Sequence, residues 1–162
     1  MMPDFKALIE QLTEDEGYRQ DVYDCSNGIP TVGIGFALRN LKPKIDPELA
    51  LEIIYWQIEN KLIHISKEHS QVILVKEAPA LHLELSEKFD FYDDLLSMVK
   101  NCLINMSFQM GIYGVSKFRK MLKAMKDKNW KEAAIEMLDS KWARSDSPQR
   151  ANRLADIVRD HG

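Results

Sequence analysis

The sequence has few cysteines, no long apolar run and no leader-like N-terminus. Two cysteines in 162 residues do not make a disulfide framework. No segment approaches the roughly 18 to 20 apolar residues that span a bilayer, so we expect no stable membrane insertion. The N-terminus also lacks the basic stretch followed by an apolar run that marks a secretory signal. We therefore expect the chain to be made and held in a cytoplasm.

Recognisable metal and cofactor patterns are missing as well. The four histidines show no metal-ligand spacing with carboxylates or thiols. The chain has no phosphate-binding loop, no internal repeat and no low-complexity segment. The sequence therefore predicts neither a cofactor nor a metal.

The composition indicates one ordinary globular domain with an uneven charge. A length of 162 residues with 45% hydrophobic side chains is enough for a sizeable core. The net charge of −3 hides an asymmetry, since residues 115–162 hold 12 Lys+Arg against 7 Asp+Glu, whereas residues 1–114 hold 10 against 18. A basic segment can meet an anionic polymer or nucleic acid, but solvated helix faces are the default.

An amphipathic helix opens the chain and ends at an acidic residue. Asp4 suits the N-cap, and Leu8 and Leu12 share the apolar face. Gly17 is placed to stop the helix, so Glu16 lies at its C-terminus. The helix dipole presents its negative end there and disfavours the ionised carboxylate. Keeping its proton is the property that a general acid needs.

A β-hairpin is predicted directly after this helix, over roughly residues 19–36. The Asn-Gly pair ending at Gly28 supplies the positive φ of a tight turn, and β-branched and aromatic residues flank it. Cys25 would end the first strand and Thr31 would begin the second. Glu16, Cys25 and Thr31 could then line one cleft, although this spacing alone is a weak signal.

The remaining sequence is dominated by helical periodicity. Helices are expected at roughly 46–69, 93–110, 118–125, 130–140 and from 148 onward. The 93–110 helix is apolar nearly all round, which predicts burial at the centre of a bundle. Ser116 and Ser147 are the expected N-caps of the helices that follow them. The run Val72–Val75 is ambiguous, and Pro79 is expected to break whatever it forms.

Four stretches, in this order, resemble the phage-type lysozymes. They are Asp15-Glu16-Gly17, the strand Thr31–Gly35, the segment Ile104–Gly111, and the stretch from Trp142 through Pro148 to Arg150-Ala151. The resemblance extends from about residue 8 to about 156 and is thin between about 37 and 90. It implies an α+β, mainly α fold of the lysozyme type.

The resemblance also implies how this fold is divided. A single lysozyme-like domain would occupy residues 1–162. Within it, a small N-terminal β-hairpin lobe would lie at roughly 17–45. A C-terminal helical bundle at roughly 70–162, together with the first helix, would form the other lobe, and a long helix would join the two.

The activity implied is that of a peptidoglycan muramidase, which cleaves the β-1,4 bond between N-acetylmuramic acid and N-acetylglucosamine. The family's catalytic Glu, Asp and Thr map to Glu16, Cys25 and Thr31. Cys25 departs from the Asp of the motif, and three roles stay open for its thiol: a base, a nucleophile, or a group that polarises water together with Thr31. Whether the reaction retains or inverts configuration also stays open.

Phe108, Gln109 and Arg150 match family positions beside the cleft and are the expected substrate-binding residues. The expected partner is a peptidoglycan glycan strand, bound by a monomer, and not nucleic acid. A phage or prophage endolysin without a signal would reach the wall through a holin or another export route. The alternative is a catalytically impaired lysozyme-fold module that binds glycan or a protein partner.

Overall fold

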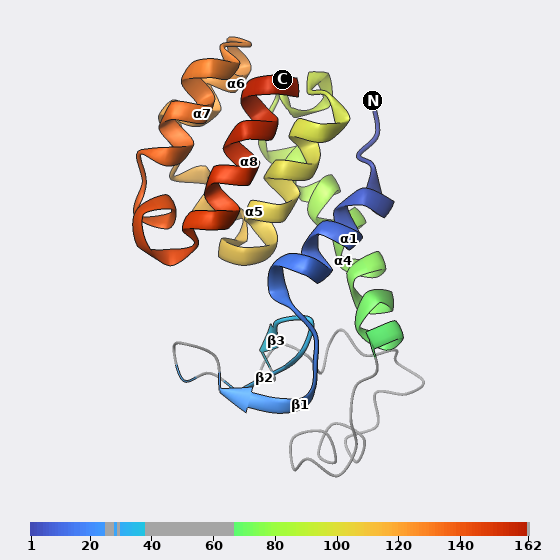
Figure 1. Cartoon of the computed structure of the whole chain (residues 1–162). Helices are drawn as coiled ribbons and strands as arrows, with labels where there is room; N and C mark the ends of the chain where they lie inside the picture. The colour runs from blue at the N-terminus through green and yellow to red at the C-terminus, as the bar shows by residue number, and fades with distance from the viewer. Residues whose placement is uncertain (25–27, 29, 38–66, 162) are drawn as a thin grey trace. The chain divides into compact units, whose positions relative to one another are not determined.

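The fold is a helical body with a small antiparallel sheet, which confirms the predicted mainly α, α+β class of the lysozyme type (Figure 1). The computed structural model describes residues 1–24, 28, 30–37 and 67–161. The elements in chain order are α1 (Phe5–Glu16), β1 (Arg19–Asp24), β2 (Pro30–Gly33), β3 (Phe36–Ala37), α4 (Lys67–Lys88), η2 (Tyr92–Asp94), α5 (Ser97–Ser116), α6 (Arg119–Lys126), α7 (Trp130–Leu138), η3 (Trp142–Asp146) and α8 (Pro148–His161).

Two compact units make up the chain. The sheet unit comprises Ile9–Glu77, and the helical unit comprises Met1–Leu8 together with Ala78–Gly162. Because the division falls between Leu8 and Ile9, α1 contributes residues to both units. The helix α4 is divided in the same way, between Glu77 and Ala78.

The sheet unit contains the predicted hairpin and one strand more. β1 and β2 are antiparallel, with Tyr23 opposite Thr31. Gly28, between them, has a φ of +70°, as the predicted tight turn requires. β2 continues into β3 through a second reversal at Ile34 and Gly35, so the sheet has the order β1-β2-β3. The sequence pattern did not indicate this third, two-residue strand.

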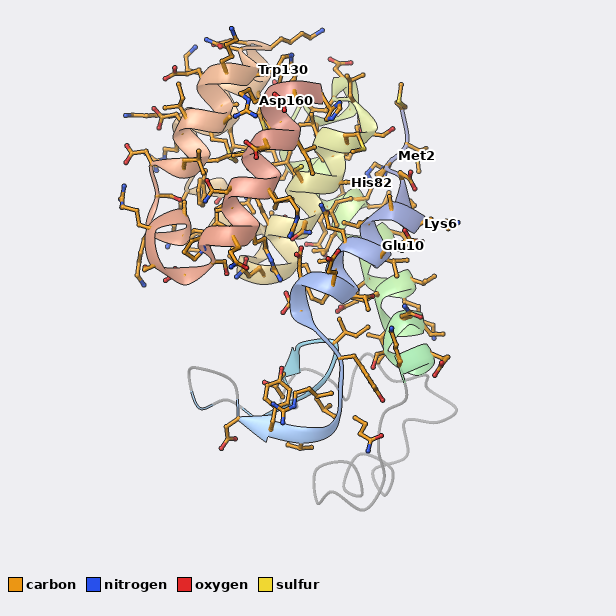
Figure 2. The ribbon with its side chains drawn as sticks, in the orientation of Figure 1. Met2, Lys6, Glu10, His82, Trp130 and Asp160 are labelled. Carbon is orange, nitrogen blue, oxygen red and sulfur yellow. The ribbon has the colours of Figure 1, made fainter. Side chains whose placement is uncertain are left out.

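The centre of the helical unit is α5, as its composition predicts. Every residue from Val99 to Ser107 is buried. α5 packs against α8, and α8 also packs against α7 and η3. Trp130 begins α7 and Asp160 lies near the end of α8, and Figure 2 shows both at the same end of the helical unit. The helices α7 and α8 therefore run in opposite directions.

Three of the expected helix boundaries are wrong. Pro79 lies inside α4 and does not break it. Proline has no N–H to donate to the carbonyl four residues before it, which here is that of Val75. Val75 lies on the exposed side of α4, so water can hydrogen-bond this carbonyl instead. Ser116 is the last residue of α5 and its hydroxyl donates to the carbonyl of Tyr113, so it does not cap α6. The predicted helix at 46–69 lies, up to residue 66, outside the described residues. Its expected end near residue 69 is wrong, because α4 continues from Lys67 to Lys88.

The first turn of α5 holds the N-terminal residues in the helical unit. Ser97 Oγ donates to the carbonyl of Met2, and Lys100 Nζ donates to that of Met1. Asn101 Nδ2 donates to the carbonyl of Asp4 at 2.9 Å. These three donors share one side of the helix, since they are three and four residues apart. The side chain of Asp4, in turn, accepts from the backbone N–H of Ala7 at 3.1 Å and is the predicted N-cap of α1.

Candidate active site

The carboxyl group of Glu16 is placed by the end of α1. Glu16 is the last residue of this helix, and the N–H of Gly17 closes the final turn on the carbonyl of Thr13 at 3.0 Å. Gly17 then takes a φ of +66°, a conformation that other residues adopt at a cost, and turns the chain toward β1. Glu16 is half-buried. The sequence therefore predicted correctly where this carboxylate lies in its helix.

Gly35 forms the surface on which this carboxylate rests. A Cβ atom added at Gly35 would lie 2.6 Å from Oε2 of Glu16 and 3.1 Å from its carboxyl carbon. Real side chains do not approach so closely, and Gly35 also has a φ of +71°. Only glycine therefore fits both the backbone turn and the position of the carboxylate. The residue was part of the matched strand motif, but nothing in the sequence pattern indicated that it touches Glu16.

Thr31 lies on the central strand of the same unit. It is 4% exposed and pairs with Tyr23 on one side and Ala37 on the other. Asp24, next along β1, is exposed and pairs with Pro30. Side chains alternate along a strand, so Asp24 points to the face opposite Tyr23 and Thr31. Asp24 is therefore not placed to act beside Thr31 in place of Cys25. Cys25 lies outside the described residues.

A polar network in the helical unit fixes Gln109. Its Oε1 accepts from the indole Nε1 of Trp142 at 2.8 Å, and its Nε2 donates to Oγ of Ser147. The backbone N–H of Ser147 in turn donates to the carbonyl of Trp142 at 2.8 Å. Trp142 itself is 5% exposed and packs edge-on against Phe118, so its ring lies in the core of the helical unit. Both ends of the Gln109 amide are thus occupied within the unit.

Arg150 is held in the first turn of α8, next to this network. Ser147 precedes α8, and its carbonyl accepts from the N–H of Ala151 at 2.9 Å. Arg150 is 7% exposed, and Phe108 on α5 is half-buried. The structure thus places Glu16 and Thr31 in the sheet unit, and Phe108, Gln109 and Arg150 in the helical unit. Sequence reasoning missed Trp142 and Ser147 as the partners of Gln109, because no local pattern links positions so far apart.

Neither a metal centre nor a membrane-spanning segment is found in the described part of the chain. Within the ranges 1–24, 30–37 and 67–161, no three His, Cys, Asp or Glu side chains are grouped to hold an ion. In the same ranges no helix is both long and apolar enough to span a bilayer.

A carboxylate at a helix end, seated against a small sheet and accompanied by a helical bundle, defines the lysozyme-like class of α+β proteins. Comparison with known proteins agrees with this class. The family model described as "Phage lysozyme" matches residues 13–158. The chain belongs to the phage lysozyme family and is a lysozyme-like glycan hydrolase.

The chain is similar to two lysozymes over nearly their whole length and to part of a longer phage protein. The chain is 34% identical to "Probable T4-type lysozyme 2" of Dictyostelium discoideum, over 93% of this chain and 92% of that protein. It is 31% identical to "Probable T4-type lysozyme 1" of the same organism, over 94% and 93%. It is also 28% identical to "Pre-baseplate central spike protein Gp5" of Enterobacteria phage T4, over 94% of this chain but 27% of that protein.

Proposed function

We propose that this protein is a peptidoglycan muramidase that hydrolyses the β-1,4 bond between N-acetylmuramic acid and N-acetylglucosamine, and that it acts as a phage or prophage endolysin. The observation that supports the proposal most strongly is the contact of Glu16 with Gly35, in a chain of the phage lysozyme family. A glycosidase needs one carboxyl group held firmly beside the scissile bond. Glu16 is the carboxyl group that the helix end and the glycine together hold in place.

Glu16 acts in this scheme as the general acid. It donates its proton to the glycosidic oxygen as the bond to the anomeric carbon breaks, and a water molecule supplies the hydroxyl group to that carbon. Thr31, buried on the central strand, positions the water through its hydroxyl group. Phe108, Gln109 and Arg150 bind the glycan, and the network around Gln109 keeps the start of α8 in place for this.

Cys25 replaces the carboxylate that the family carries on the opposite side of the sugar. As a thiolate it is either the base that takes a proton from water or the nucleophile that attacks the anomeric carbon. A thiol that only polarises water together with Thr31 would give a slower reaction by the same overall chemistry. Replacing Cys25 by Ala and by Asp separates an ionised thiolate, whether base or nucleophile, from a thiol that only polarises water.

The bond that is cut tests this function directly. Purified sacculi are digested with the protein, and the new reducing ends are reduced with borohydride and identified. A muramidase produces reduced N-acetylmuramic acid, whereas a glucosaminidase would produce reduced N-acetylglucosamine. Binding to sacculi without any new reducing ends would instead favour the catalytically impaired binding module.

A further inference from the structure

One turn of the helical unit presents an exposed aromatic ring with a lysine beside it. α5 is interrupted at Gly111, which has a φ of +73° and a ψ of 161° inside the helix. The residues after this break form a separate last turn that carries Tyr113, and its side chain is 74% exposed. A single exposed ring is ordinary on a protein surface, so what distinguishes Tyr113 is the rigid turn that carries it and the charge beside it.

The turn itself is well fixed. The hydroxyl of Ser116 donates to the carbonyl of Tyr113 at 2.6 Å, and Val115 is fully buried. Gly114 packs so closely on Met110 that a Cβ atom there would lie 2.9 Å from Cγ of Met110. The ring of Tyr113 is therefore presented by a rigid turn, and not by a loose loop.

One cation lies over the exposed ring, and two more exposed cations follow closely in the chain. Nζ of Lys117 lies 4.6 Å from the centroid of the Tyr113 ring, within the range of a cation–π contact. Arg119 and Lys120, both exposed, begin α6 immediately afterwards. We call Tyr113, Lys117, Arg119 and Lys120 the Tyr113 patch. Lys120 is 79% exposed in its side chain, and its contact with Glu136 is a loose one of 3.7 Å.

The patch is the start of the most basic segment of the chain. Residues 115–131 contain seven Lys or Arg and one acid, Asp127, in a protein whose net charge is −3. Peptidoglycan is itself anionic, because its stem peptides carry free carboxylates. An acidic protein that binds this polymer needs its cations gathered where the polymer lies, since like charges elsewhere oppose the approach.

We propose that the Tyr113 patch is a docking surface for the peptide-bearing glycan strand of the bacterial wall. The open face of the Tyr113 ring stacks on the apolar face of a sugar. Lys117, Arg119 and Lys120 pair with the carboxylates of the stem peptides. This inference rests on the proposed function in taking the wall as the ligand, and it assigns a binding surface beyond the cleft residues Phe108, Gln109 and Arg150.

Binding to sacculi tests the patch without any need for turnover. All proteins carry Glu16→Gln, so that the polymer persists, and two patch variants are compared: Tyr113→Ala and the triple variant K117Q/R119Q/K120Q. The matched controls are Ile135→Ala, another exposed apolar side chain, and K141Q/R144Q/R159Q, which makes the same charge change at other exposed sites of the helical unit. Each variant is measured on intact sacculi and on chitin, a β-1,4-linked N-acetylglucosamine polymer that carries no carboxylates.

The two patch variants should differ in which polymer they bind less tightly. The patch triple variant should bind intact sacculi about tenfold more weakly at low salt and bind the uncharged chitin as before. Tyr113→Ala should weaken binding to both polymers about fivefold. The proposal is overturned if the control triple variant weakens binding as much as the patch triple, or if Tyr113→Ala has no effect on either polymer. It is also overturned if the patch triple variant loses as much affinity for duplex DNA or for anionic vesicles as it loses for sacculi.

The results that would reject the docking surface differ from those that would reject the muramidase function. If the wild-type protein releases no reducing ends but the patch variants still bind sacculi more weakly as described, the muramidase assignment is wrong and the docking surface stands. If reducing ends are released and all variants bind equally, the enzyme stands and the docking surface is wrong.

Discussion

Gly35 is the position at which any other residue would collide with the carboxylate of Glu16. Gly35→Ala forces a Cβ atom to within 2.6 Å of Oε2 and also strains a backbone with a φ of +71°. We expect the carboxylate to be displaced and the rate of sacculus hydrolysis to fall on the order of 100-fold, because small misplacements of a catalytic group are that costly. The loss of stability should be only roughly 1–2 kcal/mol, the cost of the left-handed conformation.

Gly28 provides the matched control for this prediction. Its φ is +70°, almost the same as that of Gly35, but an added Cβ atom would meet nothing within 4 Å. Gly28→Ala should therefore lower the melting temperature by a similar amount and leave the rate of hydrolysis nearly unchanged. Equal rates for the Gly35→Ala and Gly28→Ala proteins would show that the contact with Glu16 has no catalytic consequence.

Cys25 is the second residue whose chemistry can be isolated. If its thiolate is the base or the nucleophile, Cys25→Ala should lose activity on the order of 100-fold or more, while Cys25→Asp should retain substantial activity through a carboxylate that is ionised at neutral pH. Alkylation should inactivate the wild type and spare Cys25→Asp. The pH optimum of the wild type should also lie above that of Cys25→Asp, because a thiol titrates at about 8.5 and an Asp at about 4.

Cys102 is an internal control for the alkylation experiment. It is buried on α5, and burial raises the pKa of its thiol to about 12. A thiol that hardly ionises reacts slowly, so one equivalent of reagent should be taken up quickly and a second only on unfolding. Lysis at the wild-type rate by Cys25→Ala would mean that Glu16 and Thr31 act without a third group.

At the scale of elements, His82 joins α4 to η2 and to the start of α1. Its Nδ1 lies 3.0 Å from the hydroxyl of Tyr92, the ring of Phe5 packs edge-on against it, and it is labelled within the helical unit in Figure 2. Burial, and then the positive charge of Lys100, lower the pKa of His82 below its ordinary value of 6.5, while Asp93 opposes them. The folded protein therefore takes up this proton less readily than the unfolded chain.

This difference predicts a loss of stability in mild acid. The contribution of neutral His82 is complete above a pH of about 6.5 and is lost as the pH falls from there through the lower pKa of the folded state, at a slope of at most about 1.4 kcal/mol per pH unit. His82→Gln should flatten the decline in unfolding free energy between pH 7 and 5, measured by urea denaturation. His161→Gln, which removes an exposed histidine, should leave it unchanged. Identical slopes in wild type and His82→Gln would refute this role.

The last helix is needed to close the helical unit. Ala151, Leu154 and Val158 are fully buried on α8, which packs against α5 and α7. Removing the chain from Ser147 onward should abolish cooperative thermal unfolding, because burial of each large apolar side chain contributes about 1.5–3 kcal/mol. Circular dichroism on heating measures this directly. A sharp transition in the truncated protein would show that α8 is dispensable for folding.

How far the sequence predicts these elements depends on whether the signal is local. The buried stretch of α5 and the N-cap at Asp4 follow from composition and spacing, and both are confirmed. Pro79 was misjudged because a proline breaks a helix only where its lost hydrogen bond cannot be replaced by water. The kink at Gly111 was not predicted either, since a single glycine in an apolar helix does not show whether its φ is positive.

At the scale of the whole molecule, the candidate site residues fall into two compact units. Glu16 and Thr31 belong to the sheet unit, and Phe108, Gln109 and Arg150 to the helical unit. The sequence motifs identified these positions, but not the contacts that fix them, because contacts such as Glu16 with Gly35 or Gln109 with Trp142 join distant parts of the chain. Motif spacing predicts which residues matter, and tertiary packing decides how each is held.

The proposed function depends above all on Glu16 being the proton donor for glycan hydrolysis. Glu16→Gln keeps the shape of the side chain beside Gly35 but has no acidic proton to give. The release of reducing ends from purified sacculi and the melting temperature should be measured on the same preparation. The rate should fall by about 100- to 10,000-fold, with a melting temperature close to that of the wild type. A folded Glu16→Gln protein that releases reducing ends at a near-normal rate would contradict it.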